Sequence, residues 1–298
     1  MDDGIDDTFV SSVGEEVFSA LIDFQDQLDG EEPYTSGMKT LQSIRKYGQY
    51  HRPIARFILF WLNGDSSNTE ENSMATVNAP SNVTQMNAAT KPPQIRIARR
   101  SPAYWRVTID NPPINVMGPE MVKQFQEVIN ALEADEQVRV VVFDSAVDDY
   151  FLNHSDFTAK IEDLTSLPEG PTGLPPWPDF LVRLTRLPVA SIALIRGRAT
   201  GNGSEITLAC DMSFASREKA IISQWEVGVG MVAGGGPMAR LPRLIGRNRA
   251  LEVLLSSEDI RADQAGAYGY INRALPDADL DAFVEALATR IAKFDKWA

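Results

Sequence analysis

The chain has 298 residues, of which 44% are hydrophobic and 23% are charged. This length and composition are typical of one large globular domain or two ordinary ones, and they exclude a fibrous or wholly disordered chain. The formal net charge of −13 at pH 7 repels phosphate groups, so we expect neither nucleic-acid binding nor attachment to an anionic membrane.

Few residues are available for disulfides or metal ligands. Cys210 is the single cysteine, which excludes an internal disulfide, and His51 and His154 are the two histidines, so we expect no metal site. The longest apolar run covers residues 57–62, whereas a membrane helix needs about 20 residues. The first residues are acidic, whereas a secretory signal begins with basic residues. These features predict a cytoplasmic protein.

The charge is concentrated near the start of the chain. Residues 1–73 contain 14 acidic and five basic side chains, whereas residues 74–298 contain 27 and 23. Apolar residues in 1–62 recur at spacings that fit short helices, so we predict an acidic extension there that is helical or disordered. Residues 63–93 are rich in Asn, Ser, Thr, Ala and Pro, which predicts a flexible linker. A separate domain is then expected over residues 94–298.

From residue 94 the pattern alternates between strands and helices. Strands are predicted over 94–99, 103–109 and 138–143, and a helix is predicted to begin with Pro119 in its first turn. Apolar residues of this helix recur at helical spacing and predict its buried face: Met121, Val122, Phe125, Val128, Ile129 and Leu132. The order strand, strand, helix, strand predicts an α/β fold.

The second half continues this pattern and finishes in helices. Strands are predicted over 189–195, 212–215 and 220–223. Helices are predicted over 180–187, 204–209, 238–244, 250–255, 262–267 and 280–294. Two glycine-rich stretches, over 197–203 and 228–236, are expected to be loops.

The first glycine-rich stretch has features of an anion-binding turn. Glycine lets a ligand approach the main-chain N–H groups closely. A helix that follows directly points free N–H donors and the positive end of its dipole at one place, where an anionic oxygen is stabilised. Glu205 lies in the first turn of this predicted helix. From these residues alone, an ordinary tight turn with a favourably placed glutamate is an equal alternative.

The second glycine-rich stretch follows another glutamate, Glu226. Its neighbours Trp225 and Val227 would give it partly apolar surroundings, and desolvation raises the pKa of a carboxyl group toward the range useful for acid–base catalysis. An isolated glutamate of this kind is more often an exposed loop residue. No long strand precedes these glycines and no matched acidic residue follows the next helix, so a nicotinamide site is not expected.

Residues 150–157, Tyr-Phe-Leu-Asn-His-Ser-Asp-Phe, contain a third polar group of side chains. His154, Ser155 and Asp156 are adjacent and therefore cannot take the geometry of a catalytic triad, and the sequence has no Gly-x-Ser-x-Gly motif. A histidine that bonds to backbone within a turn is the better interpretation of His154.

Together these segments resemble the crotonase superfamily, the enoyl-CoA hydratase/isomerase enzymes, from about Ile95 onward. Asn-Pro-Pro-Ile-Asn at 111–115 is similar to a turn of that family, and Glu-Ile-Thr-Leu-Ala-Cys-Asp at 205–211 is similar to one of its helices. Residues 226–241 resemble its motif EVxLGxxPGxGGxxRL. Several separate motifs therefore occur in the order of one family.

The resemblance implies the family's spiral of ββα turns ending in helices, and an acyl-coenzyme A thioester as substrate. It implies that the backbone N–H groups of Ser155 and Asn202 form an oxyanion hole for the thioester oxygen. It further implies that Glu205 and Glu226 hold and activate one water. Five further positions are expected to contact substrate: Leu152, His154, Asp156, Gly201 and Gly234. No separate cofactor is implied, because coenzyme A is part of the substrate, and a homo-oligomer is expected, a trimer or a dimer of trimers as in the family.

Three features depart from the family pattern. His154 and Asn202 stand where glycines are usual, and the chain ends before the further C-terminal helices that members usually have, so the helical C-terminal part is expected to be truncated. These departures favour a non-catalytic crotonase-like scaffold, and an isomerase or lyase with one catalytic glutamate is another alternative. Because both Glu205 and Glu226 are present, the predicted function is the addition of water to a 2,3-enoyl thioester.

Overall fold

The computed structural model of the chain describes residues 92–160, 162–163 and 166–296. The predicted extension over 1–62, and all but the last two residues of the predicted linker over 63–93, lie outside these residues. Within the described part of the chain, no helix is long and apolar enough to cross a membrane.

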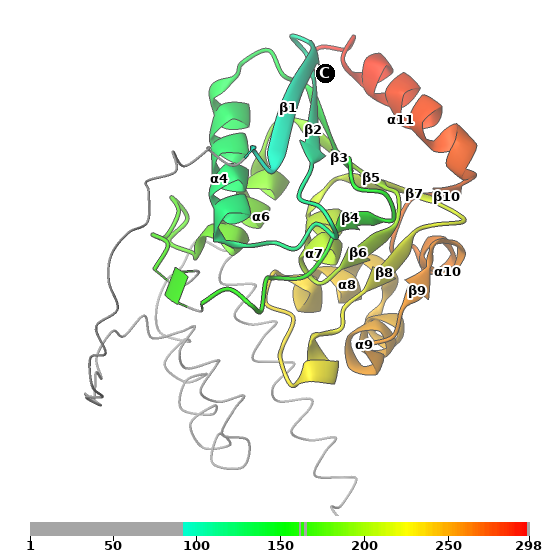
Figure 1. Ribbon diagram of the computed structural model, residues 1–298. Helices are drawn as coiled ribbons and strands as arrows, with labels where there is room; N and C mark the ends of the chain where they lie inside the picture. The colour runs from blue at the N-terminus through cyan, green and yellow to red at the C-terminus, as the bar shows by residue number, and fades with distance from the viewer. Residues whose placement is uncertain (1–91, 161, 164–165, 297–298) are drawn as a thin grey trace, which may run out of the picture. The chain divides into compact units, whose positions relative to one another are not determined.

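Six strands form a large sheet in the order β1-β2-β3-β5-β7-β10 (Figure 1). They are Ile95–Ser101 (β1), Tyr104–Ile109 (β2), Val140–Ser145 (β3), Ala190–Ile195 (β5), Met212–Ser216 (β7) and Arg273–Leu275 (β10). β1 runs antiparallel to β2, and every other neighbouring pair is parallel. Parallel strands need long crossover connections, and these place helices on the faces of the sheet.

A smaller sheet has the order β4-β6-β8-β9. Its strands are Tyr150–Leu152 (β4), Arg198–Thr200 (β6), Ile221–Ser223 (β8) and Ile260–Arg261 (β9). Three times in succession the chain passes from a strand of the large sheet to one of the small sheet, as β3 to β4, β5 to β6 and β7 to β8. A helix follows each pair, so the structure confirms the predicted spiral of ββα turns.

The helices follow the predicted order. They are Pro119–Ala134 (α4), Pro176–Arg186 (α6), Asn202–Ala209 (α7), Pro237–Ile245 (α8), Arg247–Ser256 (α9), Ala262–Tyr268 (α10) and Asp277–Ile291 (α11), with a 3₁₀ turn η1 over Glu226–Val229. α4 begins with Pro119 directly after Gly118, as predicted. All six apolar residues predicted to line its inner face are buried.

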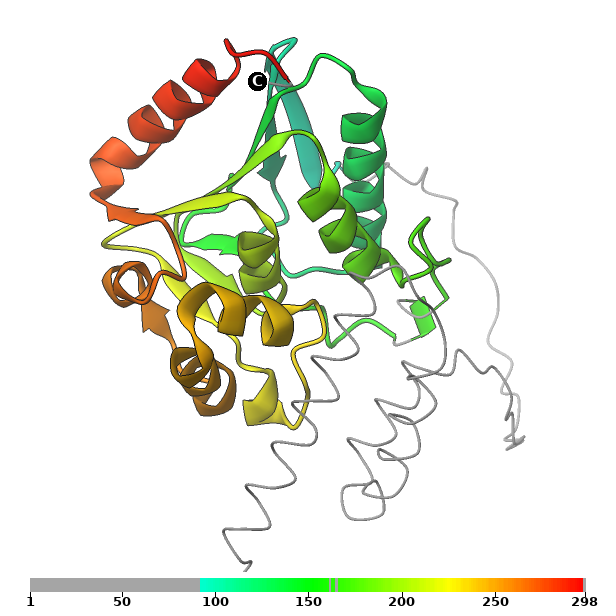
Figure 2. The same ribbon diagram turned by 180° about the vertical axis from the view of Figure 1, so that it is seen from behind.

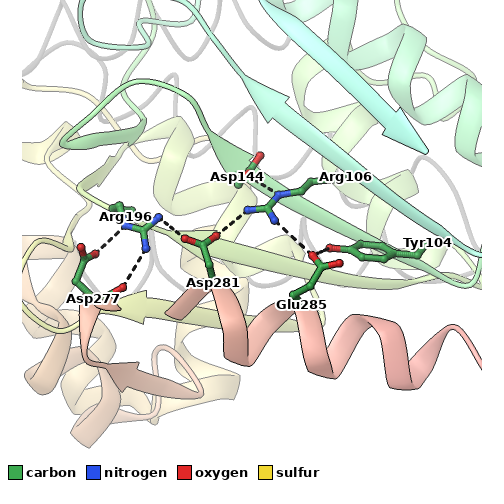
Figure 3. Close-up of polar contacts among 7 residues, drawn as sticks. All are labelled: Tyr104, Arg106, Asp144, Arg196, Asp277, Asp281 and Glu285. Carbon is green, nitrogen blue, oxygen red and sulfur yellow. Dashed lines mark hydrogen bonds and ion pairs between the residues drawn. The ribbon is translucent and has the colours of Figure 1, made fainter. Parts of the chain in front are cut away.

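Helices cover both faces of the large sheet. On one face α4 and α6 lie side by side, and Phe125 of α4 contacts Phe180 of α6 with ring centroids 4.9 Å apart (Figures 1 and 2). On the other face α11 buries Leu280, Val284 and Ala288 against strands of the sheet. Figure 3 shows that ion pairs border this second contact. Apolar cores therefore lie on both faces of the large sheet, and the site described next lies at the end of the small sheet.

Candidate active site

The predicted oxyanion segments meet because β4 and β6 are neighbours in the small sheet. Leu152 of β4 pairs with Ala199 of β6, and the chain continues from each strand into a predicted donor segment. A Cβ on Gly203 would lie 1.9 Å from the Leu152 carbonyl oxygen, so only glycine lets α7 approach β4 this closely. Gly201 has φ +55°, a backbone conformation that side chains disfavour. These glycines therefore set the position of the helix start.

The turn at 111–115 holds the first donor segment in place. Asn115 is fully buried, and its Nδ2 donates to the Phe151 carbonyl oxygen at 2.9 Å. Its own carbonyl oxygen accepts from the Asn153 N–H at 3.0 Å. Two residues further on, the Met117 N–H donates to the His154 carbonyl oxygen at 3.0 Å. The hydrogen bonds of this family-like turn therefore hold residues 151–156 in position.

The structure brings together the two residues predicted to form the oxyanion hole. The Ser155 hydroxyl donates to Asn202 Oδ1 at 2.9 Å. Asn202 is the first residue of α7, where N–H groups have no acceptor within the helix. Among the described residues, neither the Ser155 nor the Asn202 N–H donates a hydrogen bond. Two neighbouring N–H donors without acceptors can bind a developing oxyanion, and this role stays a prediction.

Glu205 lies in the first turn of α7 and is 3% exposed. Its Oε2 accepts from Trp177 Nε1 at 2.6 Å and from Asn202 Nδ2 at 3.1 Å, and its Oε1 accepts from the Gly235 N–H at 2.5 Å. Burial raises the pKa of Glu205, and these three N–H bonds oppose that effect. The carboxyl group is therefore dry and firmly oriented.

Glu226 opens η1 and is 9% exposed. Burial raises its pKa to about 7, and the negative charge of Glu205 contributes to the rise. The orientation of the Gln224 amide that satisfies both of its neighbours donates from Nε2 to Glu226 Oε2 at 3.0 Å and accepts from Ser204 Oγ at 2.7 Å. A carboxyl group that titrates near neutral pH can either give or take a proton.

The His154 side chain bonds to backbone, as the sequence favoured. Its Nδ1 lies 2.7 Å from the Ser155 carbonyl oxygen, to which a protonated Nδ1 donates. Its ring centroid lies 4.8 Å from that of Trp225 and 5.3 Å from that of Phe157. The imidazole is therefore part of an aromatic group beside Glu226.

The other predicted substrate contacts differ in their surroundings. Leu152 is fully buried at the end of β4. Asp156 accepts from the Thr158 hydroxyl at 2.6 Å and from its N–H at 2.8 Å, and these bonds lower the pKa of Asp156. A Cβ added to Gly234 would meet no atom within 4 Å. Contact of these residues with substrate stays a prediction.

Sequence reasoning missed several residues that shape the site. Trp177 donates to Glu205 from a helix 28 positions away, and Asn115 holds the Ser155 segment from outside it. The sequence shows Gly235 only as one of a run of glycines and does not indicate that its N–H donates to Glu205. A resemblance of the 111–115 turn to the family was the one signal that could have pointed to Asn115. Within the described residues, no group of three or more His, Cys, Asp or Glu side chains could hold a metal ion.

Comparison with known proteins gives one family. Residues 100–297 match the family model of enoyl-CoA hydratase/isomerase. A crystal structure of a candidate enoyl-CoA hydratase from Streptomyces avermitilis is 42% identical, with a TM-score of 0.64, over 71% of this chain and 75% of that one. An enoyl-CoA hydratase from Mycobacterium smegmatis is 26% identical, with a TM-score of 0.61, over 69% and 79% of the two chains.

A third structure extends the likeness of the fold alone. An enoyl-CoA hydratase from Bacillus anthracis is 24% identical, with a TM-score of 0.62, over 68% of this chain and 78% of that one. The family model spans about two thirds of the chain and covers both glutamates and both N–H donors. The chain therefore belongs to the enoyl-CoA hydratase/isomerase family, the crotonase superfamily.

Proposed function

We propose that this chain adds water across the 2,3-double bond of an enoyl thioester of coenzyme A. The observation that carries the proposal is the presence in one site of two buried carboxyl groups, Glu205 and Glu226, and of two N–H groups that have no acceptor among the described residues, those of Ser155 and Asn202. Buried carboxyl groups with raised pKa values, one of them raised in part by the charge of the other, are typical of acid–base sites. The comparisons support an enzyme of this family, and the hydration step is our inference.

Each of these four residues has a separate part in the proposed reaction. The Ser155 and Asn202 N–H groups would bind the thioester oxygen and stabilise the enolate that forms when water attacks the β-carbon. One glutamate takes the proton that the water loses, and the other gives a proton to the α-carbon. Atoms balance, because one water yields the 3-hydroxyl group and the new α-hydrogen. A pKa near 7 leaves Glu226 able to play either part at neutral pH.

A second candidate is a double-bond isomerase that uses one base. The observation that favours it is the set of three N–H bonds on Glu205, since these leave Glu226 as the carboxyl group with fewer donors. Such an enzyme would move a 3-enoyl bond to the 2-position through the same enolate. Glu226 would then remove and return the proton without help from Glu205.

The test is a panel of 2-enoyl-CoA thioesters of different chain lengths, with loss of the enoyl absorbance as the signal. Glu205→Gln and Glu226→Gln should each lower hydration by about 10²–10⁴-fold, because each keeps size but removes proton transfer. Glu258→Gln, the same change at an exposed position, is the matched control and should leave the rate unchanged.

Three outcomes would contradict the hydratase assignment. If Glu205→Gln still shifts a 3-enoyl bond while Glu226→Gln does not, the one-base isomerase is correct. If the parent chain binds thioesters but neither hydrates nor isomerises them, the non-catalytic scaffold is correct. If both glutamine variants hydrate at the parent rate, the two carboxyl groups do not carry the reaction.

A further inference from the structure

A row of buried polar side chains connects α10 with Glu226, and the proposed reaction gives it no role. Tyr270 follows α10 and is 2% exposed, and its hydroxyl group contacts the hydroxyl group of Ser204 in the first turn of α7. The Ser204 oxygen lies 2.7 Å from the amide group of Gln224, which follows β8. Ser204 and Gln224 are no more exposed than Tyr270. We call Tyr270, Ser204 and Gln224 the buried relay.

The hydrogen bonds of the buried relay have one direction. The Gln224 amide satisfies both of its neighbours when Nε2 donates to Glu226 and Oε1 accepts from the Ser204 hydroxyl. Nε2 then lies 3.0 Å from Glu226 Oε2 and 3.3 Å from Oε1. A hydroxyl group has one hydrogen to donate, so Ser204 accepts from Tyr270. Burial raises the pKa of Tyr270, so this donor keeps its hydrogen at neutral pH.

The orientation of the Gln224 amide affects the proton affinity of Glu226. An amide has donors at one end and an acceptor at the other. With Nε2 toward Glu226, its N–H stabilises the ionised carboxyl group. Turned by half a turn, the amide would present its oxygen instead, and that oxygen could accept only from the protonated carboxyl group. The Ser204 hydrogen on Oε1 opposes this turn.

The other surroundings of Glu226 act against its ionisation or carry no charge. Burial, and then the negative charge of Glu205, raise the pKa of Glu226. α9 packs against η1, and the bond between them is uncharged, from the Gly228 N–H to the Ser257 hydroxyl at 2.7 Å. The titratable side chains nearby are Glu205 of α7, Tyr270 after α10 and, across the Trp225 ring, His154 after β4. An oriented N–H on Glu226 therefore opposes the effects of burial and of Glu205.

We propose that Ser204 is a positioning residue for Glu226, and that its hydroxyl group, supported by Tyr270, keeps the Gln224 N–H directed at the carboxyl group. The inference rests on the proposed function and deepens it, because it names the group that prepares Glu226 for proton transfer. A purely structural relay would only satisfy its own buried polar atoms. Removing both hydroxyl groups together would then leave Glu226 unchanged.

Titration of Glu226 tests the inference without any substrate. The full chain with ¹³C-labelled glutamate is titrated by NMR, and Glu226→Gln identifies the resonance. The double variant Ser204→Ala/Tyr270→Phe removes both hydroxyl groups, so neither is left unpaired, and it should recover most of the stability that Ser204→Ala alone loses. The pKa of Glu226 should nevertheless rise by about one unit, because the amide no longer has a fixed orientation.

Two single variants complete the titration. Tyr270→Phe keeps the Ser204 hydroxyl and should shift the titration of Glu226 in the same direction by a smaller amount. Tyr104→Phe is the matched control, because it also removes a buried tyrosine hydroxyl, one that donates to Glu285 at 2.8 Å under α11. It should leave the titration of Glu226 unchanged.

Kinetics give a second readout. The double variant should lower kcat for hydration about tenfold, because Glu226 loses an oriented donor. KM should stay within about twofold, since no group that binds the thioester is changed. The pH profile of kcat should move to higher pH together with the carboxyl titration.

The outcomes separate this inference from the proposed function. An unchanged titration of Glu226 in the double variant, or an equal rise in Tyr104→Phe, would overturn the role of Ser204. If the titration shifts but the parent does not hydrate enoyl thioesters, the role of Ser204 stands and the proposed function fails. If the parent hydrates them and the titration does not shift, the proposed function stands and this inference fails.

Discussion

At the scale of single residues, the two glutamates of the site have different surroundings, and these act differently on the pKa of the same chemical group. Burial raises the pKa of both Glu205 and Glu226. Glu205 accepts three N–H bonds, which favour its ionised form. Among the described residues, no comparable set of donors binds Glu226. The negative charge of Glu205 also raises the pKa of Glu226. The two pKa values are therefore raised for partly different reasons, by burial alone for Glu205 and by burial together with a neighbouring charge for Glu226.

This arrangement predicts a pH-dependent effect of Glu226→Gln on stability. The pKa of Glu226 in the folded chain, about 7, lies above its ordinary value of 4.5, so the fold favours the protonated form. The parent therefore loses stability as pH rises from about 4.5 through 7, and glutamine does not. Glu226→Gln should raise the free energy of unfolding at pH 8 by up to ~3 kcal/mol and change it little at pH 4.

Urea unfolding of the parent and Glu226→Gln at the two pH values measures this effect. Glu258→Gln, the same change at an exposed position, is the matched control. A gain of equal size at pH 4 and pH 8 would mean that the ionisation of Glu226 is not its cause.

At the scale of elements, the loop before α8 packs closely against the start of α7, where Gly235 contacts the carboxyl group of Glu205. A Cβ on Gly235 would lie 2.2 Å from Glu205 Cδ, whereas one on Gly266 in α10 would meet its nearest atom, Ala274 N, at 3.8 Å. Both glycines lack a positive φ, so an alanine at either is acceptable to the backbone itself. The two positions therefore differ in the space that is available for a Cβ atom.

Gly235→Ala should lower hydration by at least about 10²-fold, because the carboxyl group of Glu205 must move and one of its N–H donors moves with it. Gly266→Ala should leave the rate unchanged, since it is a helical position where alanine is favourable. Steady-state rates and circular dichroism of both variants check this. A Gly235→Ala variant with full activity would show that the position of Glu205 does not matter.

The contact of α11 with the large sheet combines an apolar core with an ion-pair network. Arg106 of β2 bonds Asp144 at 2.6 Å and Asp281 at 2.9 Å, and Arg196 bonds Asp277 at 2.7 Å (Figure 3). The Arg196 bond is the largest cause that lowers the pKa of Asp277 to about 2. The side chains of Arg106 and Asp144 are 13% and 10% exposed, so solvent screens this pair little.

Arg106→Met should lower the free energy of unfolding by about 3 kcal/mol at pH 7, because it leaves Asp144 buried without its cation. Adding Asp144→Asn should recover part of that loss, since no buried charge then remains. Arg217→Met is the matched control: its pair with Asp263 is 46% and 71% exposed, and the loss should be below about 1 kcal/mol. Equal losses in Arg106→Met and Arg217→Met would contradict this account.

The elements that the sequence predicted are those with long, regular patterns. The buried stripe of α4 was found because helical spacing repeats several times within it, and β5 was found because it is a continuous apolar run. β4, β6 and β10 have three residues each, which is short for an alternating pattern, and of the strands of this length only β8 was predicted, from its two adjacent isoleucines. The strand predicted over 138–143 is Val140–Ser145, because the buried Val138 lies ahead of the strand and extends its apolar pattern.

At the scale of the whole molecule, the site could be predicted only in part, because its residues come from distant segments. Ser155 and Asn202 lie 47 positions apart and are bonded through their side chains. Periodicity indicates which residues are buried but not which distant residues meet. The family resemblance supplied the link between Glu205 and Glu226. It did not indicate Trp177, whose bond to Glu205 depends on the three-dimensional contacts of this chain.

The described part of the chain contains two apolar cores, and their residues all lie after the first 73. One core lies under α4 and α6 and the other under α11, and each is built from residues 95–288. A chain that begins at Met74 keeps every one of these residues and loses a segment of net charge −9. It should therefore be soluble, unfold in one cooperative transition, and hydrate enoyl thioesters at the rate of the full chain.

Calorimetry and sedimentation of the two chains side by side check this prediction. Phe157, Val227 and Val229 are large apolar side chains that are 44% to 55% exposed close to the proposed reacting groups. If the shorter chain aggregates or melts at a lower temperature while the full chain does not, the first 73 residues contribute to the fold and are not a dispensable extension. If it stays folded but its KM for thioesters alone changes, those residues act on substrate access and not on stability. Equal melting temperature, KM and kcat in both chains would show that residues 74–298 are sufficient for folding and for the reaction.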